Sequence, residues 1–400
     1  MMMDFAAADG IKEFIDLTVF NVFFLITLGF FGGLISGFIG SGGAFVLTPG
    51  MMNLGASAPV AVASNMCHKF PKALVGSYKR HKYGQLDVKL GLVIGVSAVA
   101  GVQLGIRIQE MLIDRWGEEA GSNLYVSSVF VVILVGVGGY MLRDLLRSRR
   151  VGGGSDEMPA LAKRVQSIRL SPMIKLKGSD RAVSVWATIP VGFCTGLLAA
   201  TIAVGGFVGV PGMIYILGVA PIMASATELS VAFLMGLTGV ITWALDGYVD
   251  IRMTLLILAG SLFGVQIGAI GTTYVRDYVI KFVMVALMLM VAVSRSVVLP
   301  TYLSDLGSIN MSHGAVSILK DCSFGIMCMA LGVGGLIVLG SMGVAKRRMS
   351  YAPVRTEETP PAPIPKATRH HLASEPMMPE PQGQTGSFAS PSYKTEKRAS

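Results

Sequence analysis

Long apolar runs with almost no charged residues constrain this chain more than any other feature. A helix needs about 20 apolar residues to cross the hydrocarbon core of a bilayer. Only 14% of the residues are charged, against about 25% in soluble domains, which excludes a soluble globular fold. The expected fold is therefore an all-α polytopic membrane protein. Its spans are predicted near residues 17–40, 56–78, 88–109, 123–142, 184–204, 220–245, 251–274, 279–299 and 319–345.

Two apolar pieces, residues 43–55 and 206–218, are too short to cross a membrane as helices. Each follows a Gly-Gly pair and contains Pro-Gly. Irregular backbone is tolerated at membrane depth only where protein or a cavity surrounds it. These pieces are therefore predicted to be glycine-broken, re-entrant segments.

The net charge of +9 is concentrated beside the apolar spans. Residues 143–181 hold ten Lys/Arg and four Asp/Glu. Such basic segments are typical of cytoplasmic loops, so no nucleic-acid partner is expected. Five crossings after Arg181 would place the basic group Lys346–Arg348 outside, against the same rule, and the sequence alone does not resolve this conflict.

The chain repeats itself at an offset of about 163 residues. GFFGGLISGFIGSGG from Gly29 matches GFCTGLLAATIAVGG from Gly192, and GVQLG from Gly101 matches GVQIG from Gly264. We predict two homologous repeats of about four transmembrane helices with glycine-broken segments, plus an extra C-terminal helix. Four crossings per repeat would make the repeats parallel, whereas a crossing by a short segment would make them inverted.

The domain organisation follows from these patterns. The tail has few large apolar residues and is expected to be disordered. A small ordered hairpin is expected at residues 165–176. The predicted parts are an N-terminal segment (1–16), a first transmembrane repeat (17–146), a basic cytoplasmic linker (147–183), a second transmembrane repeat (184–299), a loop and extra helix (300–345) and a Pro-rich tail (346–400).

Several motifs resemble the TauE/SafE family of sulfite and organosulfonate exporters. They are Gly32-Gly33-Leu34 followed by Gly42-Gly43 and Pro49, the segments Gly84–Asp87 and Gly247–Asp250, and the closing G-x-x-x-G of each repeat. The resemblance covers roughly residues 20–300. It implies movement of small sulfur-containing anions, or related small organic anions, across the cytoplasmic, or inner, membrane of the cell.

The two glycine breaks are the first candidate for substrate binding. Free N–H groups at the start of a half-helix attract anions, because the helix dipole places partial positive charge there. Close helix packing through small residues is the alternative interpretation. The candidate residues are Ser41, Gly42, Gly43, Gly205 and Gly206.

Polar residues inside two equivalent spans are the second candidate. Lys69 could attract an anion and His68 could carry a proton, although lysine side chains can also reach the headgroups. Asn65 is matched in the second repeat by Glu228, next to Thr227. An ionisable residue in a span is costly and indicates function. Glu228 could couple transport to protons, pair with Lys69, or make a structural hydrogen bond.

Gln103 and Gln266 occupy matching positions and could line the path or bridge helices. Asp87 and Asp250 are predicted to cap the helices that follow them.

Enzyme signatures such as G-x-S-x-G, H-E-x-x-H and G-x-x-x-x-G-K-[ST] do not occur in the sequence. We therefore expect a secondary transporter rather than an enzyme, with no cofactor or metal. Its expected partners are a small anion, the lipid bilayer and coupling protons, and a homo-oligomer is left open. The alternative is a membrane-embedded sensor or scaffold that recruits partners through the linker and tail.

Overall fold

The computed structural model describes residues 14–39, 43–150, 160–167, 170–177, 182–203, 205–272 and 277–351. Eight helices in this part of the chain are long and apolar enough to cross a membrane. They are α1 (Val19–Ile39), α4 (Val88–Trp116), α5 (Ser122–Arg150), α7 (Val185–Ile202), α9 (Pro221–Leu245), α10 (Ile251–Thr272), α11 (Asp277–Asp305) and α12 (His313–Tyr351). The prediction of an all-α polytopic membrane protein is confirmed.

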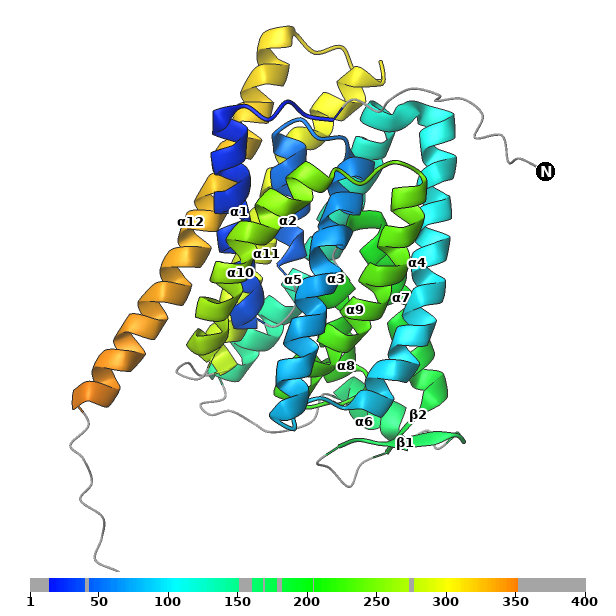
Figure 1. Cartoon of the computed structure of the whole chain (residues 1–400), viewed down its shortest axis with the longest axis vertical. Helices are drawn as coiled ribbons and strands as arrows, with labels where there is room; N and C mark the ends of the chain where they lie inside the picture. Colours follow the sequence, from blue (N-terminus) through cyan, green and yellow to red (C-terminus); the bar gives the residue numbers. More distant parts are fainter. Residues whose placement is uncertain are drawn as a thin grey trace, which may run out of the picture. The chain divides into compact units, whose positions relative to one another are not determined.

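One further long helix, α3 (Ala58–Lys82), packs beside α9 (Figure 1). Its charged residues are all basic, and they lie at Lys69 and Lys72 and in its last turn. A π-helical turn, η1 (Gly117–Gly121), joins α4 to α5.

The short helix α2 (Ala44–Asn53) doubles back along α1. Leu47 lies against Gly32 of α1, and Gly50 lies against Leu28. The order of these contacts is reversed along the two helices, so the chain returns toward the side from which α1 started. The first re-entrant segment is thus confirmed.

The short helix α8 (Gly205–Tyr215) repeats this arrangement on α7. Gly209 lies against Thr195 of α7, and Gly212 lies against Val191. Each repeat therefore opens with a helical hairpin, which returns to the side where it started, and continues with three long helices. The chain thus makes a net three crossings in each repeat, which is an odd number.

The two repeats are inverted with respect to each other. The glycines Gly29, Gly33 and Gly37 of α1 contact Ile257, Ser261 and Val265 of α10 in ascending order, so these helices run in the same direction. Helices α7 and α4 also contact each other in ascending order, so they too run in the same direction. The partners α3 and α9 are antiparallel (Figure 1). Of the two arrangements that the sequence left open, the inverted one is observed.

The linker holds a helix, α6 (Ala160–Ser167), and two strands, β1 (Met173–Lys175) and β2 (Ala182–Ser184). The strands pair antiparallel. The hairpin expected at 165–176 therefore lies further along the chain. The Lys177 N–H donates to Asp87 Oδ2 at 2.9 Å, which places the linker beside the α3–α4 turn. We call this side the linker side.

The end of α12 lies on the linker side as well (Figure 1). A Cβ added at Gly271, near the end of α10, would lie 2.8 Å from Met342 Sδ of α12. The count of five crossings after Arg181 was wrong because α7 and α8 form a hairpin. With four crossings, by α9 to α12, the basic segment at 346–348 follows the positive-inside rule.

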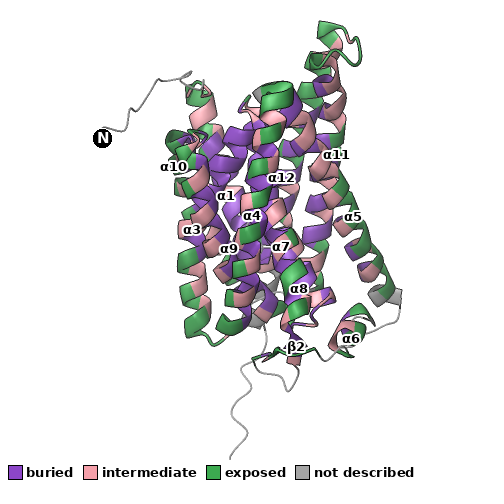
Figure 2. Ribbon diagram, turned by 90° about the vertical axis from the view of Figure 1, so that its right-hand side faces the viewer, coloured by how far each residue is buried: buried purple, intermediate pink, exposed green. Residues whose placement is uncertain are grey.

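Buried residues are concentrated on the faces of the helices that point inward (Figure 2). Large apolar side chains are exposed on the outer faces, among them Phe20, Phe23, Val96, Phe263 and Leu336. Such faces are costly in water but suited to lipid, which supports the assignment of these helices as membrane spans.

Candidate functional site

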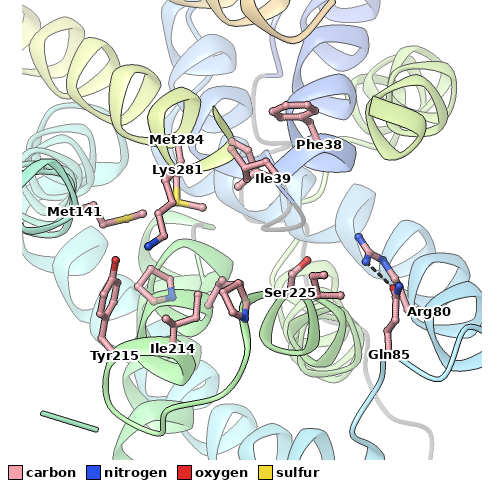
Figure 3. Close-up of a pocket in the computed structure, with 15 residues that line it drawn as sticks. Phe38, Ile39, Arg80, Gln85, Met141, Ile214, Tyr215, Ser225, Lys281 and Met284 are labelled. Carbon is pink, nitrogen blue, oxygen red and sulfur yellow. Dashed lines mark hydrogen bonds between the residues drawn. The ribbon is translucent and has the colours of Figure 1, made fainter. Parts of the chain in front are cut away.

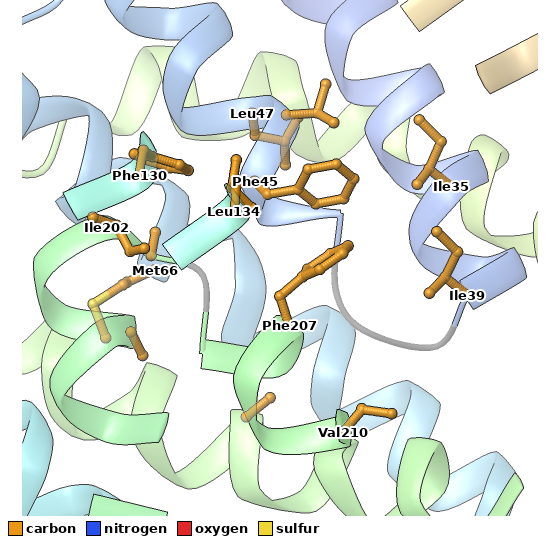
Figure 4. Close-up of a cluster of buried hydrophobic side chains, with 14 of the residues drawn as sticks. Ile35, Ile39, Phe45, Leu47, Met66, Phe130, Leu134, Ile202, Phe207 and Val210 are labelled. Carbon is orange, nitrogen blue, oxygen red and sulfur yellow. The ribbon is translucent and has the colours of Figure 1, made fainter. Parts of the chain in front are cut away.

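The two re-entrant helices begin near each other in the protein core. The rings of Phe45, one residue into α2, and Phe207, two residues into α8, have centroids 4.0 Å apart (Figure 4). Both helices therefore direct their N-terminal ends, which carry partial positive charge, into the same region.

A glycine makes the first break possible, whereas the left-handed residue at the second break is Ala203, with a φ of +59°. Gly43 has a φ of +56°, and a Cβ there would collide with the carbonyl oxygen of Gly32. A residue with a side chain is excluded by this close approach as well as by the backbone conformation. Gly205 and Gly206 are buried at the start of α8. The predicted residues Ser41 and Gly42 lie outside the described residues.

Helix α3 places three of the predicted side chains in the core. Asn65 Nδ2 donates a hydrogen bond to Thr48 Oγ1 of α2 at 2.8 Å, which ties the span to the re-entrant helix. His68 and Lys69 are buried, and within the part of the chain that the structure describes neither the imidazole nitrogens nor Lys69 Nζ has a hydrogen-bond partner. Unpaired polar groups at this depth are costly and point to a function.

Helix α9 places Glu228 opposite this group. Glu228 is 1% exposed, and neither carboxylate oxygen has a hydrogen-bond partner among the residues that the structure describes. It lies directly against α8, since a Cβ at Gly209 would collide with Glu228 Oε2. Lys69 and Glu228 interact electrostatically, but no ion pair of 4 Å or less joins them. The core thus holds a separated lysine and carboxylate beside both breaks.

A cavity of about 260 Å³ lies on the linker side of this group (Figure 3). Its lining includes Val210 of α8 and Ser225, which lies one helical turn before Glu228. Two basic side chains, Arg80 and Lys281, also line it. Lys281 is paired with Asp144 at 3.4 Å, so Arg80 is the other basic side chain of the lining, and the cavity reaches within one helical turn of the buried Glu228.

Residues 25–295 match the protein family described as "Sulfite exporter TauE/SafE". The match covers more than half of the chain. The chain belongs to the TauE/SafE family. The matched region runs from α1 to Arg295 in α11, so both repeats, both re-entrant helices and the linker fall within it, and α12 lies outside.

Three relatives from Bacillus subtilis (strain 168) have similar sequences. "Probable membrane transporter protein YdhB" is 22% identical over 64% of this chain and 93% of its own length. "Probable membrane transporter protein YjnA" is 23% identical over 66% of this chain and 96% of its own length. "Probable membrane transporter protein YunE" is 22% identical over 61% and 86%. No solved structure matches the chain. This TauE/SafE protein is a multi-pass cell-membrane transporter.

The remaining predicted residues lie away from this group or serve the scaffold. The Thr227 hydroxyl accepts the Asp87 N–H at 3.3 Å, and the Ser64 hydroxyl accepts the Asp250 N–H at 3.0 Å. These equivalent bonds attach α9 to the start of α4, and α3 to the start of α10.

Both predicted helix caps are confirmed. Asp87 Oδ1 accepts the Leu90 N–H, and Asp250 Oδ1 accepts the Met253 N–H. Gln103 donates to Thr242 of α9 at 3.3 Å and so bridges two helices, whereas Gln266 is exposed on α10.

Sequence reasoning missed Thr48, the partner of Asn65 on α2. Its only signal was a polar residue directly before Pro49 in an otherwise apolar segment. Sequence reasoning also missed the basic lining of the cavity, because Arg80 and Lys281 lie 201 positions apart in the chain and read as ordinary loop-side charges.

Proposed function

We propose that this TauE/SafE protein is a secondary transporter of small sulfur-containing oxyanions, such as sulfite, sulfonates or sulfate. The observation that carries the proposal is that Lys69 and Glu228 are buried near the N-terminal ends of α2 and α8, and that among the described residues neither Lys69 Nζ nor the Glu228 carboxylate has a hydrogen-bond partner. An oxyanion between these helix ends would accept N–H bonds and be attracted by the lysine.

In this proposal Glu228 couples the anion to protons. When the site is empty, the ammonium of Lys69 balances the carboxylate. A bound anion competes for Lys69, and Glu228 then takes up a proton because an uncompensated carboxylate in the core is costly. The linker side faces the cytoplasm in this scheme, so the basic cavity would receive the anion from inside the cell and support export.

The test is the flux of labelled sulfite, sulfate and a small sulfonate into proteoliposomes, with and without a pH gradient. We expect saturable flux of at least one anion that depends on the gradient. Glu228→Gln should reduce the gradient-dependent part to background while the protein still inserts. Glu119→Gln, which removes the same charge from an exposed turn, is the matched control.

Two results would contradict the proposal. Normal gradient-dependent flux in Glu228→Gln would remove this carboxylate from the coupling step. If folded wild-type protein transports none of the three anions, small sulfur-containing oxyanions are excluded as substrates. That result would favour the sensor or scaffold alternative.

A further inference from the structure

Each re-entrant helix ends against the last long helix of the opposite repeat. Helix α8 ends at Tyr215, whose hydroxyl donates to Asp144 Oδ2 of α5 at 3.0 Å. Helix α2 ends at Asn53, whose Oδ1 accepts from Nη2 of Arg295 on α11. Tyr215 and Asn53 occupy equivalent positions in the two repeats, so the two contacts are related by the internal symmetry.

The charges at these two contacts are balanced differently. At the end of α8, Asp144 is paired with Lys281 at 3.4 Å, and both side chains are about one-third exposed. At the end of α2, Arg295 is fully buried, and none of the ion pairs among the described residues includes it. Its polar neighbours are the amide of Asn53 and the hydroxyls of Ser323, at 3.1 Å, and Tyr302.

Several hydrogen-bond donors at this contact lack an acceptor. They are Nε and Nη1 of Arg295 and Nδ2 of Asn53. A buried guanidinium without a counter-charge costs several kcal/mol. The C-terminal end of α2 offers at most about half a negative charge, which leaves much of the cation unbalanced. The described residues therefore leave these three donors, and much of the charge, without a partner.

We propose that Arg295 forms the centre of a second anion-binding site, on the side opposite the linker, which holds a small inorganic anion between α2, α11 and α12. Arg295 and Asn53 supply the free N–H donors. The site is separate from the Lys69–Glu228 group, because α2 has ten residues and spans roughly 15 Å between its two ends. The anion would complete the attachment of α2 to the second repeat.

The test uses the purified full chain in detergent and measures its thermal unfolding in gluconate, chloride and sulfate salts at equal ionic strength. Gluconate is too large for a contact between three helices and serves as the reference. An anion that binds only the folded state raises Tm, and we expect a rise of about 3 °C or more in chloride or sulfate. Stabilisation by sulfate alone would indicate an anion of the transported class, and stabilisation by chloride would indicate a structural halide.

Asn53→Asp is the decisive variant. It places a carboxylate beside the guanidinium, so the protein supplies its own anion. We expect its Tm in gluconate to rise to at least that of wild type in the stabilising anion, with little further anion dependence. Asn123→Asp is the control: its Oδ1 accepts the Ala58 N–H, which an aspartate also accepts, and wild-type anion dependence should persist.

Lys69→Met distinguishes this site from the central one and should keep the anion dependence. Equal Tm of the wild type in all three salts would overturn the proposal. Full anion dependence in Asn53→Asp would overturn it as well. Since the readout is stability, the result is independent of whether any anion is transported in proteoliposomes.

Discussion

Equivalent positions on the two sides of the membrane carry opposite kinds of contact. On the linker side, Arg80 donates to Gln85 at 2.8 Å, and both side chains line the cavity (Figure 3). The residues that match them in the second repeat are Trp243 and Tyr248 on the opposite side. Their rings meet edge to face at 5.3 Å, and both are buried.

The difference shows how equivalent turns of an inverted repeat can carry different side-chain contacts on the two sides. The backbone is nearly symmetric, so the same turn between two helices occurs on both sides. A charged and an amide side chain keep one turn polar beside a cavity, whereas two aromatic rings fill the other and exclude water. The side on which the cavity lies is therefore decided by side chains, not by the arrangement of helices.

The largest expected effect is a difference in access between Ser225 and its equivalent, Val62. Ser225 lines the cavity and Val62 is fully buried. In protein whose four natural cysteines are replaced, Ser225→Cys should react with a membrane-impermeant thiol reagent added from the linker side. Val62→Cys should not react from either side. Equal labelling of the two would show that the two sides are equally accessible.

The next effect is the loss of aromatic packing on the opposite side. Trp243→Ala would leave a large cavity in the core, at a cost of about 3–5 kcal/mol in the free energy of unfolding. Thermal or denaturant unfolding in detergent measures this cost. Trp116→Ala removes the same ring from an exposed position and should have little effect. Similar losses in the two variants would mean that Trp243 has no special role in closing that side.

The smallest effect concerns a polar contact at the edge of the cavity. Tyr215→Phe removes the hydrogen bond to Asp144 and should lower the free energy of unfolding by about 1 kcal/mol. Tyr140→Phe is a matched control, because Tyr140 packs on the Tyr215 ring but is exposed, and its change should be within about 0.5 kcal/mol. A larger loss in the control would contradict the importance of the Tyr215 hydroxyl.

Much of the architecture was predictable because it depends on local properties. Apolar length predicted the long helices, and the Gly-Gly and Pro-Gly signals predicted α2 and α8 within a few residues of their ends. Asp87 and Asp250 were predicted as caps because capping needs only a short side chain before a helix. Each of these depends on a few neighbouring residues.

The candidate site was predictable in part. The equivalence of Asn65 and Glu228 follows from the repeat, and both are buried near the breaks. Their partners were not predictable, because Thr48 and Gly209 reach them only through the fold of the re-entrant hairpins. Arg295 was missed for the same reason: its lack of a counter-charge depends on what surrounds it in three dimensions.

The sequence by itself determined that the chain lies in a membrane, that it is duplicated and where its helices break, because hydropathy, repetition and glycine act through composition and local conformation. Only the tertiary structure decided that the repeats are inverted and that α12 ends on the linker side. A short apolar helix can cross or turn back with the same sequence. The choice follows from close packing of α2 on α1 and of α8 on α7, where glycines allow the backbones to meet.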